Sequence, residues 1–381
     1  MSMQGRPATT GSAASASSPA TGALHQVWPL DAEDSVNRRL AALILNPAKV
    51  DPGPLVDALS RHCRARGLPD PLVLETTEQD PGTGMARQAR QQHAGLVLVA
   101  GGDGTVRAVA QGLAGSEVPL AVIPAGTGNL LARNLDLPGD VDEAIELALD
   151  GPRRRIDLGR LRLRDDAPGD DQTSDQTSDQ TSDQTSADPT SFAVMAGIGL
   201  DAQMMADTPE GLKASVGWPA YLVGAARALR RPLMTVDISI DGGPPRRQRV
   251  RTVLVGNVGK LQAGLDLMPD ARPDDGLLDL CILAPHGLSG WVRTLAAAVR
   301  GPSRAAGEPL RVLPIRQVSV RAHRPQARQL DGDPIAAGRL LRVEVVPGAL
   351  VVCRPEAPTT GSAAGSTAGS TAATPVEGTL P

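Results

Sequence analysis

Two glycine-rich turns in the first half of the chain have the composition of phosphate-binding loops, and the first follows the apolar run 96–100. Apolar residues then recur at helical spacing, so this turn joins a buried strand to a helix. Glycine lets the backbone approach a ligand closely, and the amide groups and the positive end of the helix can converge on an anion. The residues that we expect to bind phosphate in this turn are Gly101, Gly102, Gly104 and Thr105.

Asp103 lies inside this turn, where a carboxylate alone would repel a phosphate. A divalent cation between the carboxylate and the phosphates would remove the repulsion, as in the chemistry of nucleoside triphosphates. We therefore expect Asp103 to organise a magnesium ion beside a bound nucleotide.

The second turn follows the apolar run 120–123 and reads Pro-Ala-Gly-Thr-Gly-Asn from residue 124. Thr127 and Asn129 add polar side chains beside the bare backbone of Gly126. We expect these three residues to contact the same nucleotide as the first turn.

Strand-like and helix-like segments alternate between residues 37 and 155, and these elements must position the two turns. Strands separated by helices predict right-handed βαβ units and a parallel sheet, whose ligands bind beyond the carboxyl ends of the strands. The predicted strands are 40–45, 72–74, 96–100 and 120–123, and the predicted helices include 85–93 and a last helix between Asp140 and Gly151. The polar residues just past the strand ends are Asn46, Thr77, Asp103 and Thr127.

From residue 156 to residue 354 the pattern changes to the alternation of half-buried strands, which predicts a β-rich second domain. The insert 165–190 contains four copies of Asp-Gln-Thr-Ser, and we interpret it as a disordered loop between two neighbouring strands. The ends, 1–36 and 355–381, are rich in small and polar residues and are expected to be disordered as well.

The composition argues against some classes of function. The 381 residues carry a formal net charge of -4, and much of the acidity lies in one tract, which argues against a nucleic-acid-binding protein. The three cysteines, Cys63, Cys281 and Cys353, are widely spaced and are interpreted as reduced packing thiols. Neither a leader nor a long apolar span is found, so we expect a cytoplasmic protein whose contact with a membrane would be peripheral.

One segment could make that contact. Residues 217–231 join an apolar stretch to a basic end, and Arg246, Arg247, Arg249 and Arg251 follow. An interfacial helix attracted to anionic lipid is one interpretation. A helix packed on the second domain is the other, and we favour it.

Two acidic turns in the second half are candidate sites. In 269–279, carboxylates surround a glycine before a strand, which suits magnesium, although a solvated acidic turn explains the same pattern. In Asp331-Gly332-Asp333, a carboxylate at the tip of a loop could act as a general base, and an ordinary Asp-Gly hairpin turn is the alternative. Spacing alone favours the alternative in both cases.

Other patterns carry less weight. Gly197-Ile198-Gly199 imitates part of a dinucleotide fingerprint but lies in strand-like surroundings, which argues against a dinucleotide site. The five histidines show no metal-ligand spacing with cysteines or carboxylates.

The set of motifs, from about residue 40 to residue 354, resembles the superfamily of diacylglycerol kinases and sphingosine kinases, in its soluble bacterial branch. The turn 101–105 alone is shared with NAD kinases and 6-phosphofructokinases, so the resemblance rests on the combination. Asn46-Pro47 is similar to the first nucleotide-binding turn of the superfamily, Thr77 to its threonine after the second strand, and 124–129 to its Gly-Thr-x-Asn segment.

The second half carries three further similarities. Residues 197–202 resemble the Gly-x-Gly-x-Asp-Ala strand of the superfamily. The turn 274–276 resembles one that holds a structural magnesium, which implies Asp274, Asp275 and the carbonyl of Leu277 as ligands. Asp331-Gly332-Asp333 stands where the superfamily usually has Asp-Gly-Glu, and the glutamate is the proposed base, which implies Asp333 in that role.

Two residues depart from this pattern. Asp333 is one methylene shorter than glutamate, and a misplacement of about 1 Å can lower a rate about a hundredfold. Leu130 follows Asn129 where many members have aspartate, which removes one polar contact.

The resemblance implies a doubly wound α/β domain with a parallel sheet, then a β-sandwich-like domain, with the active site in the cleft between them. It implies a lipid kinase that uses ATP and Mg²⁺, with diacylglycerol or a related lipid alcohol as acceptor, and it leaves a homodimer open. Asp103 and Asp333 would be catalytic. The alternatives are an enzyme similar to NAD kinase, or a regulatory relative that binds nucleotide or lipid with little turnover.

Overall fold

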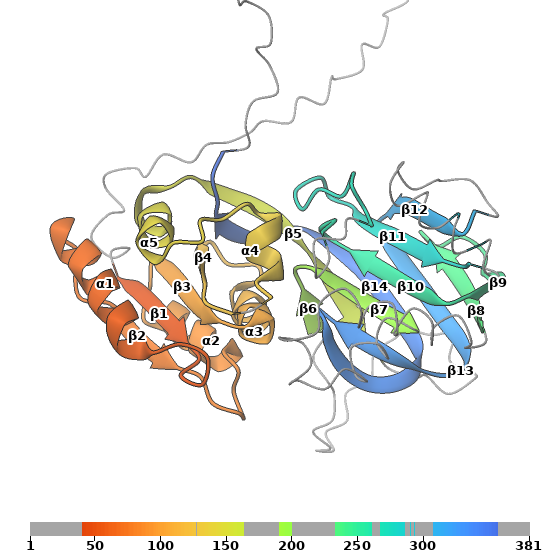
Figure 1. The fold of residues 1–381 in the computed structure, drawn as a ribbon, viewed down its shortest axis with the longest axis horizontal. Coiled ribbons are helices and arrows are strands. Elements are labelled where there is room, and N and C mark those ends of the chain that lie inside the picture. The colour runs from red at the N-terminus through yellow and green to blue at the C-terminus, as the bar shows by residue number, and fades with distance from the viewer. Residues whose placement is uncertain are drawn as a thin grey trace, which may run out of the picture.

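The computed structural model describes residues 40–126, 128–163, 190–199, 233–260, 267–285, 290, 293 and 308–356. They form an α/β part and, beside it, a part rich in antiparallel strands (Figure 1). The α/β elements are β1 (Ala41–Leu45), α1 (Pro52–Ala65), β2 (Leu72–Glu75), α2 (Thr83–Gln91), β3 (Leu96–Gly101), α3 (Asp103–Leu113), β4 (Leu120–Pro124), α4 (Leu130–Asn134) and α5 (Val141–Asp150).

The α/β part contains a parallel sheet in the order β2-β1-β3-β4. Helices α1 and α5 pack on one face through apolar side chains, and α2 and α3 pack on the other. Because both faces are covered, the central strands are apolar throughout. The predicted parallel α/β fold is confirmed, with α2 starting and ending two residues before the predicted segment.

Two helices begin with residues that fix their starts near the carboxyl ends of the strands. Asp51 precedes α1, and its Oδ1 accepts a hydrogen bond from the amide of Gly53 at 3.2 Å. Asp140 precedes α5, and its Oδ1 accepts one from the amide of Glu143 at 3.1 Å, so the last predicted helix begins directly after Asp140. Each side chain satisfies an amide that the helix itself leaves without a partner.

The second part is a sandwich of two antiparallel sheets that share β13. One sheet has the order β12-β11-β10-β7-β13 and the other β9-β8-β13-β14-β5-β6, with an apolar layer between them. A register shift between Arg321 and Gln326 accompanies the passage of β13 from one sheet to the other. The strands are β5 (Arg153–Arg162), β6 (Thr190–Phe192), β7 (Met195–Gly199), β8 (Met234–Ile240), β9 (Arg246–Val250), β10 (Thr252–Gly256), β11 (Leu278–Leu283), β12 (Leu310–Ile315), β13 (Gln317–Leu330) and β14 (Asp333–Cys353).

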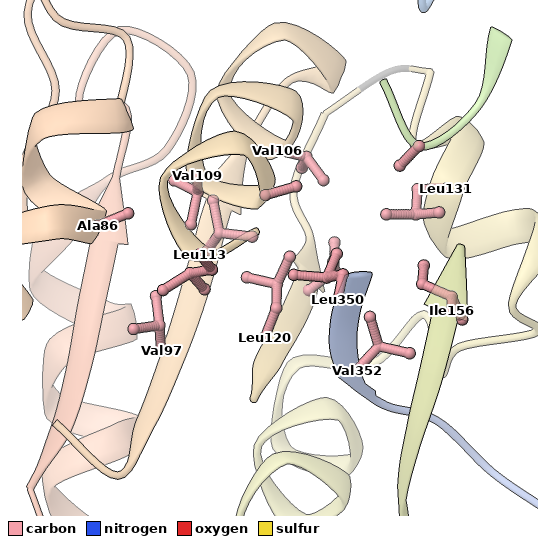
Figure 2. Close-up of a cluster of buried hydrophobic side chains, with 14 of the residues drawn as sticks. Ala86, Val97, Val106, Val109, Leu113, Leu120, Leu131, Ile156, Leu350 and Val352 are labelled. Atoms are coloured by element: carbon pink, nitrogen blue, oxygen red, sulfur yellow. The ribbon is translucent and has the colours of Figure 1, made fainter. Parts of the chain in front are cut away.

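Strands β5 and β14 connect the two parts. They pair antiparallel over most of their lengths, and the end of β14 pairs parallel with β4 through Val352 and Leu120. Figure 2 shows Leu350 and Val352 of β14 and Ile156 of β5 beside the side chains of the α/β core. The cleft between the parts therefore has a continuous sheet and an apolar core behind it.

Some expectations concern residues outside the described ranges, namely both chain ends, most of the repeat insert and the segment 217–231. The strands on either side of the insert, β5 and β6, do pair with each other. Among the described residues, no helix is long and apolar enough to cross a membrane.

Candidate active site

A cleft of about 610 Å³ lies between the start of α3 and the turn that joins β13 to β14. It brings together residues from both halves of the chain, including Asn46, Gly102, Asp103, Gly104, Thr105, Leu330, Asp331 and Asp333. A larger hollow of about 780 Å³ lies between α1, α5 and the end of β4, and none of the predicted site residues lines it.

Asp103 is the first residue of α3 and links the two glycine-rich turns. Its Oδ1 accepts a hydrogen bond from the amide of Leu130, the first residue of α4, at 2.7 Å. Burial raises the pKa of Asp103, this amide lowers it, and the nearby Asp333 raises it again. Burial and Asp333 both disfavour the charged form of Asp103, and a bound cation would offset this, so the position is compatible with the predicted magnesium role, which stays a prediction.

The glycines of the two turns are packed against each other. A Cβ on Gly126 would lie 3.0 Å from the carbonyl oxygen of Gly101 and 3.1 Å from the Cα of Gly102, and a Cβ on Gly128 would collide with the carboxylate of Asp103. A Cβ on Gly102 would meet nothing within 4 Å. Gly126 and Gly128 thus let the two turns approach each other, whereas Gly102 faces open space in the cleft.

Asn46 connects the end of β1 to the first turn. Its Nδ2 donates to Oγ1 of Thr105 at 3.5 Å, and its Oδ1 accepts from the amide of Ala48 at 2.9 Å. These residues lie between β1 and β3, where the strand order of the sheet changes direction. Ligands bind at such points in open α/β sheets.

Three other predicted nucleotide contacts have different positions. Thr77 is exposed and does not line the cleft, and its Oγ1 accepts from the amide of Asp80 at 3.0 Å. The side chain of Asn129 bonds to the backbone within the second turn. Its Nδ2 donates to the carbonyl oxygen of Gly126 at 2.6 Å, and its Oδ1 accepts from the amide of Gly126 at 3.0 Å. Thr127 lies outside the described residues.

The two aspartates of the turn 331–333 lie in different environments. Asp331 is only 3% exposed, and its Oδ1 accepts hydrogen bonds from the amides of Val194 and Met195 at 3.0 and 2.8 Å. Burial raises its pKa to about 6 against the opposing effect of these amides. Asp333 is exposed and pairs with Arg107, whose Nη1 lies 3.0 Å from its Oδ2.

Arg107 was not predicted, and it ties the two halves of the cleft together. Its Nη1 also donates to the carbonyl of Leu330 at 2.7 Å, so α3 is fixed to the far turn by one side chain. The available sequence signal is its spacing, because Arg107 follows Asp103 by four residues and therefore lies on the same side of a helix. Lys49, which follows Asn46 by three residues, also lines the cleft and was also missed.

The acidic turn after residue 273 lies outside the cleft. Oδ1 of Asp275 accepts a hydrogen bond from the amide of Leu277 at 3.0 Å, and Oδ2 of Asp274 lies 3.6 Å from Nη1 of Arg354. Oδ2 of the buried Asp157 accepts a hydrogen bond from the amide of Gly276 at 2.7 Å. Burial raises the pKa of Asp157, its hydrogen bonds with backbone amides lower it, and the nearby Asp275 and Asp274 raise it.

Crowded carboxylates of this kind suit a hard cation, although the described residues contain no group of three potential metal-ligating side chains. The ligand set Asp274, Asp275 and the Leu277 carbonyl therefore stays a prediction.

The Gly197–Gly199 segment and the three cysteines have the structural roles that the sequence indicated. Gly197 and Gly199 lie in β7, between β10 and β13, and not in a strand-to-helix turn. The three cysteines are free and buried.

Comparisons with known proteins cover both parts of the chain. Residues 41–161 match the diacylglycerol kinase catalytic domain, and residues 193–354 match the YegS C-terminal NAD kinase beta sandwich-like domain. A probable lipid kinase YegS-like from Stenotrophomonas maltophilia (strain K279a) is 32% identical over 319 residues, which cover 80% of this chain and 93% of the relative. One from Klebsiella pneumoniae (strain 342) is 29% identical over 313 residues, covering 81% and 93%.

A solved structure has a similar fold. The crystal structure of a putative diacylglycerol kinase from Bacillus anthracis str. Sterne superposes with a TM-score of 0.63 at 20% sequence identity. The match covers 86% of this chain and 98% of that one. The α/β domain and the sandwich thus occur together in both chains.

Proposed function

This chain belongs to the family of YegS-like lipid kinases, and we propose that it transfers the γ-phosphoryl group of ATP to the hydroxyl of diacylglycerol or a related lipid alcohol. A phosphotransferase that acts on lipids follows from the family. The identity of the lipid, the metal and the roles of single residues are the further steps of the proposal.

One observation carries it most strongly. The glycine-rich turn at the start of α3 and the turn 331–333 lie about 230 residues apart in the sequence but line one cleft, and Arg107 joins them. Phosphoryl transfer needs a site that holds the phosphates and places a proton acceptor near them. The cleft brings together the residue types for both tasks.

The donor side of the reaction falls to the glycine-rich turns. Free amides at the start of α3 and the open space at Gly102 suit the phosphates of ATP, and Asn46 and Thr105 add polar groups beside them. Asp103 would hold Mg²⁺, which, when bound, neutralises the charge that develops on the phosphates. Much of the rate enhancement would then come from positioning and charge neutralisation.

The acceptor side falls to the turn 331–333. The resemblance implied Asp333 as the base, but Asp333 is exposed, and its Oδ2 already accepts a hydrogen bond from Nη1 of Arg107 at 3.0 Å. Asp331 lines the same cleft, carries no side-chain ion pair in the described structure and has a pKa near neutrality. We therefore assign proton acceptance to Asp331, and to Asp333 the task of holding Arg107, and with it α3, against the turn 331–333.

Incubation of the protein with labelled ATP, Mg²⁺ and a panel of lipid acceptors in uncharged detergent micelles tests this function. The expected result is a labelled lipid phosphate that requires Mg²⁺ and that Asp103→Asn forms about a thousandfold more slowly. Phosphorylation of NAD and of no lipid would contradict the proposal. So would tight ATP binding with no product on any lipid, which is the behaviour of a regulatory relative.

A further inference from the structure

The outer face of the second sheet of the sandwich is strongly basic. Along β9, β8, β13, β14 and β5, alternate residues point into the apolar layer, and the residues between them point outward. The outward arginines are Arg160, Arg162, Arg247, Arg249, Arg321 and Arg342. We call this surface the basic sheet face, and it occurs in a chain whose formal net charge is -4.

Strand register places these arginines side by side. Arg342 on β14 is directly opposite Arg162 on β5, and Arg321 and Arg247 flank Asp237 from the two sides of β8. Like charges directly opposite each other on a sheet destabilise it. The opposed pair Arg342 and Arg162 therefore costs stability, whereas Asp237 offsets the charge of the arginines on either side of it.

Acidic side chains on this face neutralise only part of the charge. Glu344 pairs with Arg160 and Arg162 at 3.0 and 3.3 Å, and Asp237 pairs with Arg247 at 3.0 Å. Within the described part of the chain, Arg249, Arg321 and Arg342 make no ion pair or hydrogen bond through their side chains, and all three are exposed. Their guanidinium groups are therefore available to an external anion.

Small hydroxyl side chains occupy positions between the arginines. Thr235, Ser239 and Ser319 point outward from β8 and β13. Hydroxyl and guanidinium groups together are suited to binding phosphate oxygens. This composition favours electrostatic adsorption to phosphate groups over insertion into hydrocarbon.

The face borders the cleft along its β5–β6 edge. Arg162 ends β5 on the outer side, and the next residue, Leu163, lines the cleft together with Thr190 at the start of β6. A charged surface that lies against the face is therefore next to the acceptor side of the cleft.

We propose that the basic sheet face docks the protein on a bilayer surface rich in anionic phospholipids, so that a lipid acceptor reaches the cleft at its β5–β6 edge. The inference rests on the proposed function, because a lipid acceptor has to be drawn from a membrane. The proposal does not use the segment 217–231, for which an interfacial helix was the less favoured of two interpretations. Each arginine near an anionic bilayer contributes about fivefold to the partition coefficient, and salt screens the attraction.

Vesicle sedimentation of a triple variant tests the docking. Arg249→Gln, Arg321→Gln and Arg342→Gln are combined, and the matched control combines Arg61→Gln, Arg64→Gln and Arg87→Gln, which removes the same charge from exposed positions on α1 and α2. The probes are vesicles of phosphatidylcholine with and without phosphatidylglycerol, at low and high salt. Thermal unfolding reports whether both variants fold.

The unaltered protein and the control are expected to bind vesicles that contain phosphatidylglycerol, and high salt should release them. The triple variant should bind about a hundredfold more weakly. Equal binding by the triple variant, an equal loss in the control, or binding of phosphatidylcholine vesicles alone would overturn the proposal.

Kinase assays separate this inference from the proposed function. In uncharged micelles the triple variant should phosphorylate the lipid as well as the unaltered protein, whereas on anionic vesicles it should be slower. If the unaltered protein docks through this face but phosphorylates no lipid, the function fails and the docking surface stands. If it phosphorylates lipid on vesicles equally well with and without the three arginines, the docking surface fails and the function stands.

Discussion

The donor and acceptor sides of the cleft are built in different ways. On the donor side, consecutive strand–turn–helix units place the turns at one edge of a parallel sheet, and the two glycine-rich turns contact each other through residues about 30 positions apart or less. On the acceptor side, the turn 331–333 is held by amides of residues near 194 and by Arg107 of α3, which lie far away in the sequence. The first side is specified locally and the second by the assembled fold.

This difference suggests how each side can change. Glycines that touch each other leave little freedom on the donor side, because an added methyl group collides with backbone or with Asp103. The acceptor side presents two carboxylates, one buried and one exposed; Arg107 forms an ion pair with the exposed Asp333, and its charge also lowers the pKa of the buried Asp331. We therefore expect substitution of Asp333 to disturb the fold less than substitution of Gly126 or Gly128.

Replacement of Asp103 should have the largest effect. Asp103→Asn keeps an oxygen that can accept the hydrogen bond from Leu130 but removes the charge, so the fold is retained while kcat falls about a thousandfold. Labelled-phosphate transfer and thermal unfolding measure the two properties. In Asp103→Ala the hydrogen bond is lost as well, and stability should also decrease. Normal turnover in the Asn variant would show that the donor side works without this carboxylate.

The two aspartates of the acceptor turn should differ in their effects. Asp331→Asn retains an oxygen for the amides of Val194 and Met195, so we expect kcat to fall about a hundredfold or more with unchanged ATP affinity. Asp333→Asn should cost no more than about tenfold, because it weakens the hold on Arg107 and leaves the proposed base in place. Steady-state kinetics with the best lipid acceptor measure kcat for both variants. The reverse order of effects would assign the base to Asp333.

Stability should depend on the ionisation of Asp331. Its pKa is about 6 in the folded protein and about 3.9 in an unfolded chain, so the folded state holds the proton more tightly. The stabilisation is fully present below pH 4 and is lost as the pH rises through 6. Between pH 4 and pH 7 the protein should lose about 2 kcal/mol that Asp331→Asn does not lose. Urea unfolding of both proteins at the two pH values measures this, and parallel curves would contradict the burial of an ionisable carboxyl group.

Gly102→Ala should have a smaller effect that is confined to nucleotide binding. A Cβ at this position meets nothing within 4 Å and the backbone φ is -82°, so the fold should change little. The added methyl group would stand where the phosphates approach and should weaken ATP binding about tenfold. Gly139→Ala is the matched control, because its Cβ would also meet nothing, and Gly139 does not line the cleft. Titration with ATP measures the affinity of the two variants. Equal affinities would show that the phosphates of ATP do not bind beside Gly102.

The elements of the α/β part could be predicted because their signals are local. Apolar runs and helical spacing gave β1, β3, β4 and α5 nearly to the residue, and Asn46 and Asp103 follow strand ends that lie at the same edge of the sheet. Thr77 follows a strand end as well, but that strand is β2, the outermost strand of the parallel sheet, and Thr77 does not line the cleft.

Features that depend on long-range contacts could not be predicted. No spacing in the sequence distinguishes Asp331 from Asp333, because the burial of Asp331 arises only when β13 meets β7. The interdomain role of Arg107 depends on the same meeting of distant segments. The basic sheet face appears only when five strands are aligned in register.

The central claim is that the two sides act on one transfer step, and a double-mutant cycle tests it most directly. The kcat for lipid phosphorylation is measured for Asp103→Asn, for Asp331→Asn and for the double variant. Residues that act as a unit in catalysis have strongly non-additive effects. We predict that the double variant is about as slow as Asp103→Asn alone. Losses that simply multiply, to about a hundred thousandfold, would contradict the claim that both carboxylates serve the same step.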